Sequence, residues 1–229
     1  MEPANLLHIL HLSDPSLPIG GFSHSTGLET YVQERIVFDK KTATEFIAQQ
    51  LAQNIFYTDA AILSLAYDAA ADNNFEAVLE LDQICSAVKL PTEMRIASIK
   101  LGVRLLKVFE NEREFIFPDQ YFAAIKNGDA VGHYCIAFGL LCAAMHASKQ
   151  NALTAFYYNA AAGFVTNAVK LIPLGQQDGQ EVLMSLFDLM NELIQKSLSP
   201  DKEMIGYCCA GFDIRSMQHE RLYSRLYMS

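Results

Sequence analysis

The residues best suited to chemistry in this sequence are its histidines, which could hold a metal ion. His8 and His11 lie three residues apart, and two histidines at that spacing on one helix can share a metal. His24 follows in the next loop, but no carboxylate or cysteine stands near these residues in the sequence to complete a site. We therefore expect a structural or surface role for them, with metal contact as the alternative.

The cysteines give a second possible site. Cys208 and Cys209 are adjacent and could bind a soft metal, although adjacent side chains more often point in different directions. The chain has five cysteines, an odd number, and no CxxC motif. This usage fits a reducing cytoplasm better than a disulfide framework.

Composition and motifs exclude several classes of function. No GxxxxGK[ST], GxGxxG, GxSxG or HExxH motif occurs, so we do not expect nucleotide hydrolysis by the chain itself. A net charge of −9 argues against nucleic acid and anionic membrane as partners, and no apolar run reaches the length of a membrane span. Only 19% of the 229 residues are charged, which indicates that another subunit covers part of the surface.

Apolar residues recur at helical spacing along the chain, and strand signals are weak. We predict an all-α fold, a single-domain bundle of about nine or ten helices over residues 1–229. Capping boxes at Thr26/Glu29 and Asp178/Glu181 predict two of the helix starts. Predicted helices span residues 5–12, 26–35, 40–71, 75–88, 93–109, 118–126, 131–148, 152–171 and 178–197, with a last segment from 199. The positions of Arg95, Lys100, Arg104 and Lys107 predict a solvated helix face.

The loop over residues 13–29 breaks this helical pattern. Pro15 and Pro18 stop the preceding helix, and Gly20-Gly21 allows a positive φ. The loop nevertheless carries apolar side chains at Leu17, Ile19 and Phe22. Such a loop either packs under the body of the protein or is presented to a partner.

The C-terminal segment 204–229 is rich in arginine, leucine and tyrosine. Leu222/Leu226 and Tyr223/Tyr227 are i,i+4 pairs, so a helix here would present an apolar and aromatic stripe beside Arg225. Tyrosine and arginine are enriched where protein interfaces concentrate their binding energy. We predict that this segment docks, either on its own body or on a partner.

Three separated motifs resemble the UreF family of urease accessory proteins, in the same order and spacing across essentially the whole chain. They are LPIGGFSHS at 17–25 with GLE at 27–29, VKLIPLGQ at 169–176 with DGQ at 178–180, and MQHE at 217–220 with LYSRL at 222–226. The resemblance implies an all-helical, cytoplasmic protein that is not an enzyme. It implies a homodimer that joins UreD (also called UreH) and the GTPase UreG to deliver nickel to the urease apoprotein.

The resemblance also implies roles for particular residues. Tyr158 falls where a family tyrosine supports dimerisation, although Thr154 stands where family members can carry an arginine. No cofactor is expected to bind tightly, and the implied transient nickel contacts are His219, His24 and Cys208, the last lying two residues from the position of a cysteine in some relatives, Gly206. The expected partner-binding residues are Phe22, His219, Leu222, Tyr223, Arg225, Leu226 and Tyr227.

Two alternatives stay open. The protein could regulate GTP hydrolysis by UreG, which would change the hydrolysis rate at saturating concentrations of this chain. It could instead be a metal-dependent helical enzyme built on His8, His11, His24 and His219 around an apolar pocket. That enzyme would bind metal tightly and stoichiometrically as an isolated chain.

Overall fold

The computed structural model describes residues 3–14, 16–21, 24–110, 115–207 and 209–228. Within these ranges no strand occurs, and the predicted all-α fold is confirmed. None of the helices among these residues combines the length and the apolar character that crossing a bilayer requires. Phe22 and Cys208 lie outside the described residues.

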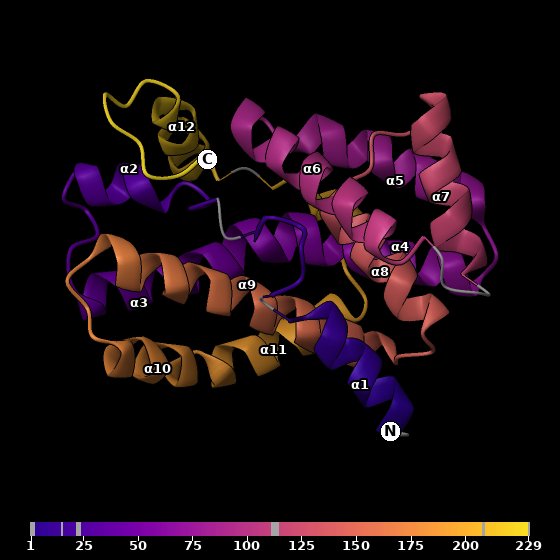
Figure 1. The fold of residues 1–229 in the computed structure, drawn as a ribbon, viewed down its shortest axis with the longest axis horizontal. Helices are drawn as coiled ribbons and strands as arrows, with labels where there is room; N and C mark the ends of the chain where they lie inside the picture. The colour runs from indigo at the N-terminus through magenta and orange to yellow at the C-terminus, as the bar shows by residue number, and fades with distance from the viewer. Residues whose placement is uncertain (1–2, 15, 22–23, 111–114, 208, 229) are drawn as a thin grey trace.

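Most of the α-helices are connected by short loops, the long loop between α1 and α2 being the main exception, and Figure 1 shows their arrangement. A π-helix, η2, lies between α3 and α4, so helix runs without a break from Lys40 to Ala71. The elements are α1 (Pro3–Leu12), α2 (Leu28–Gln33), α3 (Lys40–Gln49), η2 (Gln50–Ala60), α4 (Ala61–Ala71), α5 (Phe75–Val88), α6 (Thr92–Val108), α7 (Ile116–Asn127), α8 (Tyr134–Ala144), α9 (Lys149–Leu171), α10 (Gln176–Ser185), α11 (Phe187–Ser197), the 3₁₀ helix η3 (Lys202–Met204) and α12 (Ala210–His219).

The core forms around α8 and the long helical stretch that contains α4. Every side chain from Cys135 to Cys142 is buried, and α8 packs against α4 and α6. A helix that is apolar on all sides must be surrounded by others, which explains its central position. On the other side α9 packs against η2, α10 and α11.

Both helix starts predicted from capping boxes differ from the structure. The capping box at Thr26 is wrong, because α2 begins only at Leu28, after Gly27 in the left-handed conformation with φ 79°. In the second box Asp178 accepts a hydrogen bond from the backbone N–H of Gly175 (3.1 Å), so α10 begins two residues earlier than predicted. A turn at Leu186 then divides the predicted helix 178–197 into α10 and α11.

The last residues of the chain form an irregular tail rather than the helix whose apolar stripe the spacing of leucine and tyrosine predicted. Helix α12 ends at His219, and residues 220–228 follow in turns and bends. In Figure 1 this tail and α12 lie beside α2, at one corner of the bundle. The tail is therefore placed by tertiary contacts, which the next section describes.

Candidate functional site at the C-terminal tail

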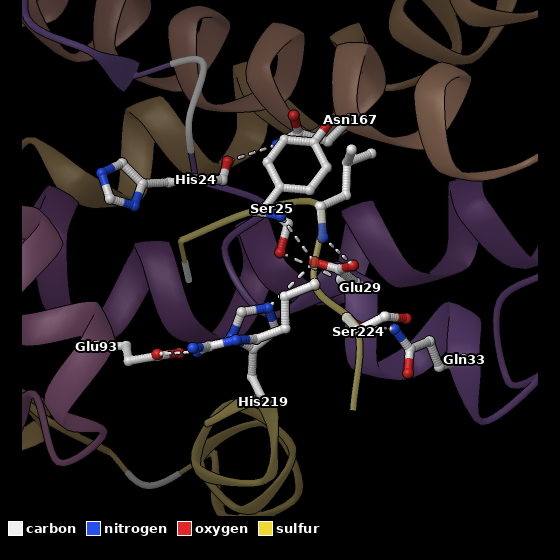
Figure 2. Close-up of polar contacts among 11 residues, drawn as sticks. His24, Ser25, Glu29, Gln33, Glu93, Asn167, His219 and Ser224 are labelled. Atoms are coloured by element: carbon white, nitrogen blue, oxygen red, sulfur yellow. Dashed lines mark hydrogen bonds and ion pairs between the residues drawn. The ribbon is translucent and has the colours of Figure 1, made fainter. Parts of the chain in front are cut away.

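The carboxylate of Glu29, on α2, is the centre of the site (Figure 2). Only 4% of this residue is exposed. One carboxylate oxygen accepts the backbone N–H of Leu226 (2.7 Å), and the other accepts that of Tyr227 (3.1 Å). The second oxygen also lies 3.2 Å from Nε2 of His219. A single buried side chain therefore holds both the end of α12 and the tail that follows it.

His219 lies between two carboxylates. Its Nδ1 is 2.6 Å from Oε2 of Glu93 on α6, and its Nε2 faces Glu29. Each ring nitrogen therefore has one carboxylate oxygen within hydrogen-bonding distance. The ring is 1% exposed, so both contacts are shielded from solvent.

Further polar contacts secure the tail along α2 and α6. Arg225 Nη1 lies 2.7 Å from Glu93 Oε1, so the second oxygen of this carboxylate pairs with the guanidinium. Gln33, one turn after Glu29 on α2, donates its amide N–H to the carbonyl oxygen of Ser224 (3.0 Å). Residues of α2 and α6 thus contact three consecutive parts of the C-terminal segment: α12, Ser224–Arg225 and Leu226–Tyr227.

The described part of loop 13–29 packs under the body of the protein. Leu17 is buried, and Ile19 packs against the core. Arg104 donates a hydrogen bond to the carbonyl of Ile19 (3.0 Å), so this arginine anchors the loop as well as lying on the predicted solvated face. The carbonyl of His24 accepts from the amide of Asn167 (2.9 Å) on α9.

The imidazole of His24 points away from His219 in Figure 2. His24 is buried, and its burial, together with the positive charges of Lys100 and Arg104, lowers the pKa of its ring. This environment favours the neutral form of the His24 ring. The two histidines proposed from the sequence lie in different electrostatic environments and do not share a site.

The candidate metal ligands named from the sequence do not come together in the described part of the structure. Among the described residues no group of three or more histidine, cysteine, aspartate or glutamate side chains could hold a metal ion. His8 and His11 line a cavity of about 900 Å³ beside α1, whose lining includes neither His24 nor His219. The four-histidine pocket of the enzyme alternative is thus not formed, while transient nickel contact at His24, His219 or Cys208 stays a prediction.

The predicted partner-binding residues of the tail divide into two groups. Tyr227 is buried, Leu222 is half-buried, and His219 is enclosed. Tyr223 is fully exposed and Leu226 is 68% exposed. The hydrogen bonds that hold this part of the tail are made by backbone groups, the carbonyl of Ser224 and the N–H of Leu226. The tail therefore docks on its own body and also displays apolar side chains outward. Exposed apolar neighbours on α12 and the tail are Ile214, Met217 and Met228.

Tyr158, the predicted dimerisation residue, lies on α9 and is 45% exposed. Thr154, one turn earlier, is also exposed and donates its hydroxyl to the carbonyl of Gln150. Both side chains are open to a second subunit, and their role in dimerisation stays a prediction.

Sequence reasoning missed Glu29 and Glu93 as site residues. Glu29 stands within the GLE motif at 27–29, but the capping-box pattern interpreted it as a local helix-start residue. Glu93 opens α6 and looks like an ordinary first-turn carboxylate. Since each meets its partners only after more than a hundred residues of intervening chain, no local pattern indicates the contact.

Together the fold and the site define an all-helical protein that carries its own docked C-terminal tail. The UreF family model matches residues 37–187. The chain is 50% identical over 221 residues to the urease accessory protein UreF of Haemophilus influenzae (strain ATCC 51907 / DSM 11121 / KW20 / Rd), a match that covers 96% of this chain and 94% of that relative.

Two further relatives carry the same name. The UreF of Actinobacillus pleuropneumoniae serotype 5b (strain L20) is 47% identical over 96% of this chain and 97% of its own length. That of Bacillus sp. (strain TB-90) is 34% identical over 98% of this chain and 99% of its own length. The chain belongs to the UreF family.

Proposed function

We propose that this protein is a non-catalytic accessory protein of urease maturation. In this proposal it works in the cytoplasm as a homodimer, joins UreD/UreH and the GTPase UreG, and helps to deliver nickel to the urease apoprotein. Membership of the UreF family and the names of the relatives support the role in urease maturation. We choose the tail as the binding surface because Glu29 anchors its backbone while the side chains of Tyr223 and Leu226 are exposed to solvent.

The anchoring prepares the tail for a partner. A free, flexible segment would lose conformational entropy when it bound, and that loss would weaken the complex. The hydrogen bonds from Gln33 to Ser224 and from Leu226 to Glu29 hold the backbone on either side of Arg225. The exposed side chains of Tyr223 and Leu226 can then add apolar contact area to an interface, and the tail loses less conformational entropy on binding.

Nickel would pass through the assembly as cargo rather than stay as a resident ion. His219 can bind a metal only through a neutral ring nitrogen, because a metal ligand must give up its proton. Both of its nitrogens face carboxylates, Glu29 and Glu93, in the docked tail. A contact between His219 and nickel therefore requires movement of α12 or the tail, and we propose that partner binding supplies that movement.

Exposed tail residues allow a test that leaves folding intact. We expect the Tyr223→Ala/Leu226→Ala variant to lose most of its capture of UreD in a pull-down, with an unchanged thermal melt. Met184→Ala, a change of another exposed apolar residue on α10, is the control and should bind normally. A chain shortened after Gln218 should lose binding while it keeps its helical signal. Wild-type capture of UreD by both tail variants would refute the proposed surface.

A further inference from the structure

Two cysteines from different helices face each other in the core. The sulfurs of Cys85, on α5, and Cys135, on α8, are 3.8 Å apart, and both residues are fully buried. A disulfide requires a sulfur separation of about 2.05 Å, so an approach of less than ~2 Å would join them. Cys142 lies two turns further along α8 and is equally buried. It provides an internal comparison for the pair.

The surroundings of the pair favour one ionised sulfur. Burial by itself would raise the pKa of Cys85, but hydrogen bonds with Cys135 and His133 and the positive charge of Lys89 lower it below that of an ordinary thiol. Burial and the neighbouring Cys85 raise the pKa of Cys135. Burial also raises the pKa of Cys142. The thiolate, not the thiol, is the nucleophile in cysteine chemistry.

We propose that Cys85 and Cys135 are a dithiol oxidised by hydroperoxides to a reversible disulfide between α5 and α8. The Cys85 thiolate attacks one peroxide oxygen, the O–O bond breaks, and the departing oxygen takes up a proton to leave as water. The sulfur of Cys135 then attacks the resulting sulfenic acid, and the hydroxide it displaces leaves as water with the proton of Cys135. In total, two thiols and one hydrogen peroxide yield one disulfide and two waters.

A small oxidant can approach from the side of Ser86. This residue lines a surface hollow of about 420 Å³ together with Asp82 and Val131. Its hydroxyl lies 2.8 Å from Nε2 of His133, the residue that also contacts Cys85. Hydrogen peroxide is close to water in size, so small movements of Ser86 and its neighbours suffice to admit it. Large alkylating reagents would enter much more slowly.

Oxidation changes the charge around a buried ion pair. Lys89 Nζ lies 2.7 Å from Asp59 Oδ2, and the Cys85 thiolate adds a second negative charge near this ammonium. Disulfide formation removes that second charge and ties α5 to α8. The state of the dithiol is therefore linked to the contact between α5 and the π-helix η2, which carries Asp59. This inference does not depend on the proposed role in urease maturation.

The test uses the full reduced chain. The chain is titrated with hydrogen peroxide and then denatured in the presence of an alkylating reagent that blocks the remaining free thiols. Intact mass spectrometry and peptide mapping follow. We expect an intact mass that carries two alkyl groups fewer than the reduced control, a Cys85–Cys135 cross-linked peptide, and complete reversal by dithiothreitol added before alkylation. The Cys142→Ser control should form the same cross-link. Cys135→Ser should instead accumulate a sulfenic acid at Cys85, which dimedone traps.

Wild-type protein keeps the test independent of how the variants fold. The oxidation rate should level off near neutral pH, whereas that of glutathione, measured in parallel, should keep rising toward a thiol pKa of about 8.5. A different disulfide pairing would overturn the proposal. So would reduced Cys85 and Cys135 after exposure that oxidises glutathione completely, or a pH profile that follows that of glutathione.

Discussion

Glu29 and His219 are separated by 190 positions in the sequence, yet the carboxylate of one lies 3.2 Å from the ring of the other. The same carboxylate accepts the backbone N–H groups of Leu226 and Tyr227. One side chain of the short helix α2 therefore contacts both the end of α12 and the tail that follows it.

The first prediction concerns this anchor. Glu29→Ala removes the acceptor of both tail N–H groups and the partner of His219, so the tail should leave α2. A hydrogen bond to a charged group contributes about 1.5–3 kcal/mol. We therefore expect the amides of Leu226 and Tyr227 to exchange hydrogen at least about tenfold faster. Glu220→Ala, an exposed carboxylate beside His219, should leave exchange unchanged. Equal protection in the two variants would show that Glu29 does not hold the tail.

The second prediction concerns the packing of α6. A Cβ atom on Gly102 would lie 2.2 Å from the backbone oxygen of Gly132 and 2.7 Å from a backbone carbon of His133. Backbone atoms cannot move aside cheaply, so Gly102→Ala should lower the free energy of unfolding by about 3 kcal/mol. Gly163→Ala on α9, where nothing lies within 4 Å of the added carbon, should raise it by about 0.5–1 kcal/mol. Urea denaturation measures both changes, and similar values for the two variants would contradict this account.

The third prediction concerns the buried carboxylate of Asp82 on α5. It accepts the backbone N–H groups of Val131 (2.8 Å) and Gly132 (3.1 Å) and the hydroxyl of Tyr121, and so shapes the connection from α7 to α8. Asp82→Ala leaves these buried donors without an acceptor and should lower the free energy of unfolding by about 3–5 kcal/mol. Glu80→Ala, an exposed change on the same helix, should stay within about 0.5 kcal/mol of wild type. Comparable melting temperatures for the two variants would rule out this role.

The fourth prediction concerns the alkaline limit of stability. Burial opposes the charge of Lys89, but Asp59 and the neighbouring thiols outweigh it and raise the pKa of Lys89 above its ordinary value. The ion pair therefore contributes its full stability below the unfolded lysine pKa of about 10.4 and loses it as the pH rises from there toward the folded pKa.

Urea denaturation between about pH 9 and pH 11.5 tests this window, which brackets the unfolded lysine pKa. The free energy of unfolding should fall more steeply with pH in wild type than in the Lys89→Met/Asp59→Asn variant, which lacks both charges. Parallel pH profiles would show that the pair makes no pH-dependent contribution. Tyrosines that titrate in the same range affect both proteins alike, so the difference reports the removal of the two charges.

The sequence by itself determined the helical class and most helix positions. Helix α5 lies over 75–88 as predicted, and the Asn74 side chain caps it in the structure. Helical periodicity is a property of a few consecutive residues, so it can be read from the sequence. The spaced motifs around residues 17–29, 169–180 and 217–226 also predicted the family, which the comparisons confirm. Local patterns of this kind do not depend on contacts with distant parts of the chain.

Only the tertiary structure decided how distant residues are used. Glu29 accepts hydrogen bonds from the tail instead of capping its own helix. Residues 220–228 are non-helical, and two of their backbone N–H groups donate to that carboxylate. Cys85 and Cys135 lie side by side in the core although they belong to different helices. A contact between helices depends on their packing geometry, which follows from the whole set of buried side chains at once. The spacing of residues along the chain carries no direct record of it, and for that reason the site became visible only in three dimensions.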